Sequence, residues 1–274
     1  MNELLNNPAV QAGVAPFVVA LTVAVILRRS RLLGLAIGAG FFTVVFLALG
    51  FSFDSLTSVR KMILAGTGAT ALVLLLELAK VQATNAVRAA IALAAAAVAV
   101  WVIVRVLQQR EMGSALLAGA AAALYLALLV ESANRISSDS VRAASAALML
   151  GLGSGGLALL GASASMAQAG IAIGASAGAV LLVQMLTGKR APLGWTLALP
   201  ANVVAGLVGL LAVFTGALPW YCLLPTLAIP WATLVVPSGK WSVWLTAFLS
   251  ALAALIPMLL AVALAWFAAS SSST

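Results

Sequence analysis

Long apolar stretches separated by short polar loops constrain the fold of this chain more than any other feature. A helix needs about 20 predominantly apolar residues to cross the hydrocarbon core of a bilayer. The sequence predicts such spans at 8–27, 32–51, 62–79, 87–107, 113–131, 143–162, 165–187, 192–218 and 241–268. The apolar stretch 220–236 is shorter and contains Pro225 and Pro230, so it is either a tenth span or a re-entrant segment.

Charge is too scarce for a water-soluble domain. Only 14 Lys and Arg and 6 Asp and Glu occur in 274 residues, or 7%, whereas about a quarter of the residues of a soluble domain are charged. Lipid is therefore the solvent for most of the chain, and backbone groups in lipid must be satisfied within helices. We expect an all-α, polytopic integral membrane helical bundle with 9–10 transmembrane helices. The loops are short, so residues 1–274 form a single transmembrane domain with no soluble domain.

The basic residues indicate the orientation, because cytoplasmic loops carry an excess of Lys and Arg. With ten spans and the N-terminus outside, the basic residues of the cytoplasmic loops are Arg28, Arg29, Arg31, Lys80, Arg88, Arg135, Arg142, Lys189, Arg190 and Lys240. Those on the external side are Arg60, Lys61, Arg105 and Arg110. This excess on one side predicts an integral protein of the bacterial inner (plasma) membrane with its N-terminus outside.

A short internal match indicates a two-fold plan. The sequence GLAIGA at 34–39 is repeated as GIAIGA at 170–175, on helices that run in opposite directions in the ten-span arrangement. Inverted repeats of five plus five spans would produce this match, with halves at 8–131 and 143–268, and such repeats are a basis of many secondary transporters. A chance match is the alternative, because Ala, Gly, Leu and Ile dominate the composition.

Glycines four residues apart mark helix-packing surfaces. They occur as Gly34 with Gly38, and as Gly170, Gly174 and Gly178. Small residues at this spacing let two helix backbones approach closely. The surfaces serve either packing within the chain or an oligomer contact. The glycine cluster at 151–156 also fits GxGxxG, but it follows no strand, so we interpret it as close packing or as a helix break rather than as a dinucleotide site.

Polar residues near or inside spans are the candidate substrate or coupling sites, because burying polar groups in lipid is costly. Glu77 and Lys80 are three residues apart at a predicted span end, and they form either an interfacial ion pair or a proton-coupling site. Pro200 is predicted to kink the span 192–218 and to free the carbonyl of Thr196. Thr196, Pro200 and Asn202 would then form a small polar site inside the span. The alternative is a kink whose free carbonyl group is hydrogen bonded by a neighbouring helix.

The residues that are missing exclude most chemistry. The chain has no histidine and one cysteine, Cys222, which excludes histidine-ligated haem, histidine-containing zinc sites and serine–histidine hydrolysis. We expect no catalytic residues, no metal and no cofactor, and therefore no enzyme. The net charge of +8 comes from scattered loop residues, so nucleic acid is not an expected partner. The expected surroundings are the lipid bilayer and, through the glycine surfaces, a second copy or a membrane partner.

Two functions agree with these observations. The first is a permease or flippase for a small or amphipathic solute, supported by the number of spans, the short loops and the internal match. The second is a non-catalytic membrane subunit or an assembly or scaffold factor of a larger membrane complex. Few polar residues lie deep in the spans, which argues against a hydrophilic substrate.

Overall fold

The computed structural model describes residues 7–50, 56–82, 84–161, 163–191, 196–216, 218–237 and 241–271. The chain is 86% helical and has no strands in this described part. The elements are η1 (Val10–Val14), α2 (Ala15–Leu27), η2 (Arg31–Gly34), α3 (Leu35–Val44), η3 (Val45–Leu49), α4 (Ser58–Leu78), α5 (Asn85–Leu107), α6 (Met112–Ile136), α7 (Ser140–Leu160), α8 (Ala164–Thr187), α9 (Ala198–Phe214), η4 (Trp220–Leu223), α10 (Leu224–Leu234) and α11 (Val243–Ser271).

Residues at the helix ends satisfy backbone groups that the helix itself cannot. The side chains of Thr57, Thr84 and Asp139 accept hydrogen bonds from the first-turn N–H groups of α4, α5 and α7. At the C-terminal end of α8, Gly188 has a φ of 62°, a left-handed conformation that glycine adopts without steric cost. The intervening residues are mainly Ala, Leu and Val, and burial of one or more faces stabilises each helix.

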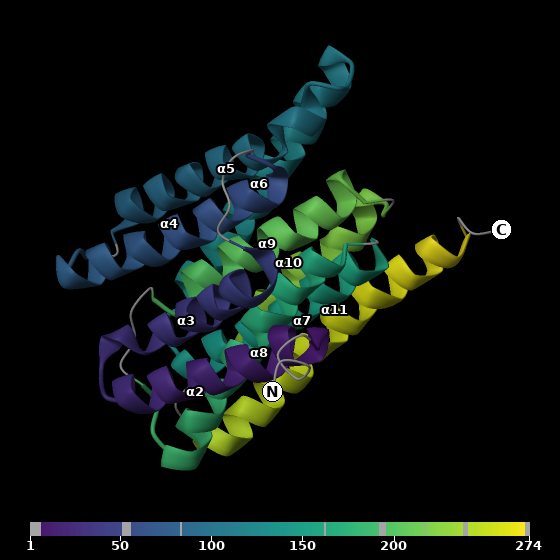
Figure 1. Ribbon diagram of the computed structural model, residues 1–274. Coiled ribbons are helices and arrows are strands. Elements are labelled where there is room, and N and C mark those ends of the chain that lie inside the picture. The colour runs from purple at the N-terminus through teal and green to yellow at the C-terminus, as the bar shows by residue number, and fades with distance from the viewer. Residues whose placement is uncertain are drawn as a thin grey trace.

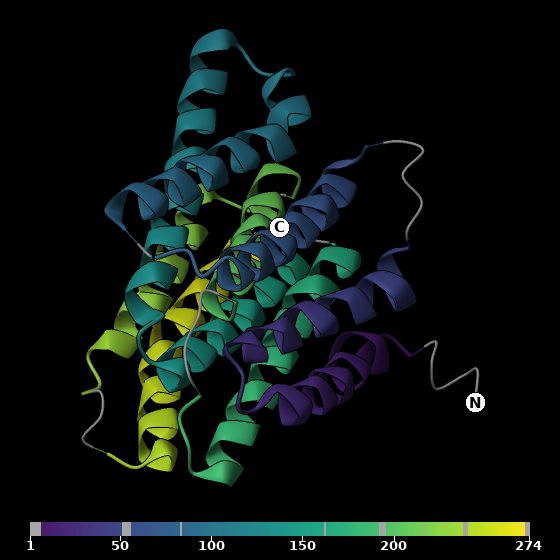
Figure 2. The ribbon, with the colours of Figure 1, turned by 90° about the vertical axis from the view of Figure 1, so that its left-hand side faces the viewer.

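Helices α7, α8 and α9 form the centre of the bundle. Two thirds of the most apolar part of α7 and of α8 is buried (67%), and α9 is buried along nearly its whole length. The pair α2 and α3 packs on α8, while α10 and α11 pack on α7. On the other side α4 and α6 pack on α9, and α5 pairs with α6 (Figure 1). The tip of the α5–α6 hairpin projects beyond the other helices (Figure 2).

The prediction of an all-α helical membrane bundle is confirmed. Eight of the described helical stretches are long and apolar enough to cross a membrane, and two shorter apolar helices, Ala198–Phe214 and Trp220–Leu234, match the remaining predicted stretches. The latter is helical through Pro230, and its crossing as a tenth span stays a prediction. Lys240, which contributed to the orientation, lies outside the described residues.

The internal match falls on two neighbouring helices. Residues 34–39 belong to the end of η2 and the start of α3, and residues 170–175 belong to α8. Helices α3 and α8 pack against each other. The division into inverted halves stays a prediction.

Candidate functional site: a lateral cleft between α4 and α5

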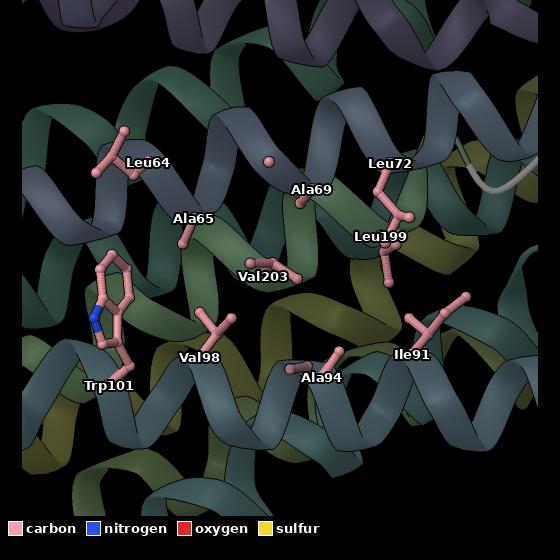
Figure 3. A pocket seen from close by; sticks show the side chains of 12 residues that line it. Leu64, Ala65, Ala69, Leu72, Ile91, Ala94, Val98, Trp101, Leu199 and Val203 are labelled. Carbon is pink, nitrogen blue, oxygen red and sulfur yellow. The ribbon is translucent and has the colours of Figure 1, made fainter.

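An apolar cleft of about 290 Å³ separates α4 from α5. One wall is α4, the other is α5, and α9 provides the floor (Figure 3). The lining residues are Leu64, Ala65, Gly68, Ala69, Leu72, Ile91, Ala94, Ala95, Val98, Trp101, Leu199 and Val203. The side chains of Leu64, Leu72 and Trp101 are each about two fifths exposed (39%, 38% and 40%), so the cleft is open at the side of the bundle.

The cleft exists because its walls carry small side chains and because α5 packs mainly on α6. Between Leu64 and Leu72, the lining residues of α4 are Ala65, Gly68 and Ala69. A Cβ atom at Gly68 would have no neighbour within 4 Å. By contrast, a Cβ at Gly66 would lie 2.7 Å from both Phe41 and Val204. The face of α4 that carries Gly66 is therefore tightly packed, whereas the face that carries Gly68 borders open space.

A buried cation lies at one end of the cleft. The Lys61 side chain lies one turn before Leu64 and Ala65, and the residue is only 5% exposed. Its Nζ donates a hydrogen bond to the carbonyl oxygen of Trp101 at 2.9 Å and lies 5.3 Å from the centre of the Trp101 ring. The ammonium is therefore held by a carbonyl oxygen and by the face of an indole, which both attract cations.

The cleft is built for binding an apolar group rather than for chemistry. Among its lining residues only Trp101 has a polar side-chain atom, the indole nitrogen. An acid, base or nucleophile is therefore missing from the lining. The described residues also contain no group of three or more His, Cys, Asp or Glu side chains that could hold a metal ion.

The structure places Glu77 and Lys80 at the end of α4 opposite Lys61. Glu77 is half-buried in the last turn, beyond Leu72, and does not line the cleft. Lys80 is exposed and has a φ of 50°. Its backbone N–H donates to the carbonyl of Glu77 at 3.1 Å. The backbone of Lys80 thus ends the helix.

Thr196, Pro200 and Asn202 do not form one polar site. The helix begins at Ala198, so Pro200 lies in its first turn, where a missing N–H breaks no helical bond; the predicted kink inside a span is wrong. The Thr196 hydroxyl donates to the carbonyl of Arg31 at 2.8 Å.

Asn202 belongs to a packed interface instead. It is fully buried, and its Nδ2 donates to the carbonyl of Leu129 at 2.7 Å and to Ser132 Oγ at 3.4 Å. Its side chain thus bonds to α6, while its neighbour Val203 lines the cleft. Asn202 is therefore a helix-packing residue. The sequence does not reveal the cleft, because no polar residue marks it.

The glycines identified in the sequence lie at contacts within the chain. A Cβ at Gly170 or Gly174 would collide with α7, and α7 is continuous through 151–156, so the alternative of a helix break is wrong. Gly34 lies against the backbone of 196–197, and a Cβ at Gly38 would lie 2.7 Å from Thr70. Gly178 is looser, with Leu148 as the nearest neighbour at 3.6 Å.

Two other hollows border polar contacts that the chain makes within itself. An apolar hollow of about 220 Å³ between α6, α9 and α10 is lined in part by Tyr125, whose hydroxyl is hydrogen bonded to that of Thr226 at 2.8 Å. A polar hollow of about 410 Å³ is lined by Arg88, Glu131 and Arg135 among others. Glu131 and Arg135 form an ion pair there at 3.2 Å, as expected from their spacing of one turn.

Sequence reasoning also missed a buried charge cluster at the start of α7. Asp139 is 4% exposed and forms ion pairs with Arg190 and, at 3.9 Å, with Arg142. Arg190 also donates to Thr246 Oγ1 at 3.0 Å and so connects α7 to α11. An aspartate directly before a helix is a signal for an N-terminal cap, but nothing in the sequence pairs Asp139 with Arg190.

Comparison with known proteins finds no match to a family model, to a curated protein or to a solved structure.

Proposed function

We propose that the protein is a permease or flippase for a small amphipathic molecule, whose apolar part occupies the cleft between α4 and α5. The observation that carries this proposal is the cleft of about 290 Å³, lined almost entirely by hydrocarbon and open at the side of the bundle. A molecule dissolved in the bilayer could enter such a cleft without passing through water. We propose no catalytic step, because the lining offers no acid, base or nucleophile.

A hydrophilic substrate has less support. Carriers of polar solutes need polar groups deep in their spans, and such groups are expensive to bury there. The amide nitrogen of Asn202 is used by α6, and Glu77 lies at a helix end. The cleft lies beside the bundle centre at α9, so an amphipathic molecule in it would reach the most buried helix through Leu199 and Val203.

The orientation belongs to the same proposal. We propose that the N-terminus lies on the outer side of a bacterial plasma membrane, and the excess of basic residues in the predicted cytoplasmic loops supports this. Lys61 and Trp101 then lie toward the outer surface, because Lys61 is in the first turns of α4 and is one of the basic residues assigned to that side. The polar end of an occupant would therefore face outward.

The alternative is a non-catalytic subunit or assembly factor of a larger membrane complex. The glycine surface at Gly170 and Gly174 gives it little support, because both residues are buried against α7. The projecting tip of the α5–α6 hairpin is the observation in its favour, since Met112, Leu116 and Leu117 are 82%, 69% and 75% exposed there. Such a role would not depend on the α4–α5 cleft.

A substitution that fills the cleft tests the proposal. Gly68→Leu places a side chain in open space on the cleft wall, and Gly13→Leu is the matched control, because a Cβ at Gly13 also has no neighbour within 4 Å. The purified proteins are reconstituted into vesicles with lipids that carry a fluorescent nitrobenzoxadiazole acyl chain. Dithionite then bleaches the lipids of the outer leaflet, and the rate of further bleaching measures transbilayer movement.

We expect the wild-type protein to accelerate this movement, and Gly68→Leu to reduce the rate by about tenfold, the factor that about 1.4 kcal/mol of lost binding gives. Gly13→Leu should retain the wild-type rate. Equal rates for Gly68→Leu and wild type, or a wild-type rate no higher than that of protein-free vesicles, would overturn the proposal.

A further inference from the structure

The apolar lining of the cleft cannot by itself select an occupant from a membrane. An acyl chain in the bilayer is already in a hydrocarbon environment, so moving it into an apolar cleft gains little from the hydrophobic effect. Selectivity must therefore come from the end of the cleft that carries a charge. That end is defined by Lys61 and Trp101.

Lys61 lies on the same face of α4 as the cleft wall. Positions 61, 64, 65, 68 and 72 follow the three- and four-residue spacing of one helix face, and the last four line the cleft. On α5, Arg105 lies one turn beyond Trp101 and is exposed. Two cations, one from each wall, thus lie at the same end of the cleft.

Neither of these cations forms an ion pair in the described part of the chain. The ion pairs found there join Asp139 to Arg142 and Arg190, and Glu131 to Arg135. A buried cation is costly unless a negative charge or several hydrogen bonds compensate it. The structure gives Lys61 one carbonyl acceptor and one aromatic face, although its ammonium has three N–H donors. An anion at this end would supply the missing acceptors.

Resting on the proposed function, we propose that the occupant is a membrane lipid with a net negative headgroup, held by Lys61 and Arg105, with one acyl chain in the cleft. The continuity of the charged end with about 12 Å of apolar wall from Leu64 to Leu72, at 1.5 Å per helical residue, fits a molecule with both parts. Both cations lie near helix ends, the level at which a lipid headgroup lies when its chain occupies the cleft. The indole of Trp101 lies at the end of the lining that carries Leu64 (Figure 3), and its face is 5.3 Å from Lys61 Nζ.

Lipid binding, measured apart from transport, tests this assignment. The full-length protein in mild detergent is mixed with equal amounts of phosphatidylglycerol and phosphatidylcholine with identical chains, and native mass spectrometry counts each bound lipid. The variants are Lys61→Met, Lys61→Arg and Arg105→Gln. Lys80→Gln is the matched control, because Lys80 is exposed at the opposite end of α4. Arg105 is also exposed, so its replacement tests the charge even if Lys61→Met fails to fold.

The wild type should bind phosphatidylglycerol at least about fivefold more tightly than phosphatidylcholine, the preference that one basic residue near a membrane surface provides. Arg105→Gln and Lys61→Met should reduce this preference, and Lys61→Arg and Lys80→Gln should keep it. Equal binding of the two lipids by the wild type, or a full preference in Arg105→Gln, overturns the inference.

The same measurement separates the inference from the proposed function. Gly68→Leu should lower the binding of both lipids, because it fills the cleft whatever the headgroup is. If Gly68→Leu lowers both while the charge variants leave the preference unchanged, the cleft binds lipid but the headgroup assignment is wrong. If Gly68→Leu changes neither lipid, the cleft is not the binding site and both proposals fail.

Discussion

The contact between α7 and α8 depends on glycine at positions where the two backbones touch. A Cβ added to Gly170 would lie 2.6 Å from both the N and the Cα atoms of Gly155 and 3.0 Å from the carbonyl oxygen of Gly151. All three neighbours are backbone atoms, so no side chain can rotate away. Gly178, two turns further along α8, would place its Cβ 3.6 Å from the flexible end of Leu148. Gly170→Ala should therefore be destabilising, and Gly178→Ala should be tolerated.

The magnitude follows from the distances. Ordinary contact begins near 3.4 Å, so Gly170→Ala must move the helices apart by about 0.8 Å at this point. A gap of 0.5–1 Å loses about a quarter to a half of the dispersion energy of each affected atom pair, and overpacking costs about 1–3 kcal/mol. The better helix propensity of alanine returns about 1 kcal/mol. We expect a net loss of about 1 kcal/mol for Gly170→Ala, and for Gly178→Ala a gain of up to about 1 kcal/mol.

The unfolding of these variants can be followed at a cysteine that the chain already contains. Cys222 is the sole cysteine and is buried, so a thiol-reactive fluorophore reports unfolding when the protein is titrated with sodium dodecyl sulfate in mixed micelles. Gly170→Ala should unfold at a lower detergent fraction than wild type, and Gly178→Ala at an equal or higher one. Identical unfolding curves for the two variants would refute the packing argument.

Three further substitutions test other parts of the structure by the same unfolding assay. Asp139→Asn should cost about 3 kcal/mol, because it leaves Arg190 without its buried partner; a loss below about 1 kcal/mol, the size of a surface pair, would contradict this. Lys80→Gly should stabilise by about 1 kcal/mol, because glycine adopts the left-handed conformation without strain, and a destabilised variant would show that the lysine side chain matters more. Asn202→Ala should cost about 1–2 kcal/mol, because it removes the hydrogen bond to Leu129. It should leave lipid movement unchanged at temperatures where the variant is folded. Slow lipid movement in the folded variant would instead assign Asn202 to the transport path.

Helix positions could be predicted from the sequence because apolar length is a local property. The predicted stretch 165–187 differs by one residue at its start from α8, Ala164–Thr187. The stretch 192–218 was too long at both ends, since α9 spans Ala198–Phe214. Its flanking residues carry no charge, so the apolar stretch has no sharp boundary in the sequence. The position of Pro200 in the first turn of α9 could not be predicted for the same reason.

The cleft could not be predicted because it consists of space between helices. Ala65, Gly68 and Ala69 resemble the small residues of any tightly packed helix, and only the neighbours of α4 decide that Gly66 is packed and Gly68 is open. In the sequence, Lys61 has the pattern of a loop charge that orients the chain. Its burial against Trp101 depends on how α4 and α5 lie against each other, which brings two residues forty positions apart into contact. The composition does not contain this arrangement.

The most direct measurement is a cryo-electron microscopy structure of the protein in nanodiscs that contain phosphatidylglycerol and phosphatidylcholine. Our account predicts elongated density between α4 and α5, along Gly68 and Ala69, with its broader end at Lys61 and Arg105. A structure in which α4 and α5 close directly against each other, or in which the cleft is open but holds no lipid density, would contradict it.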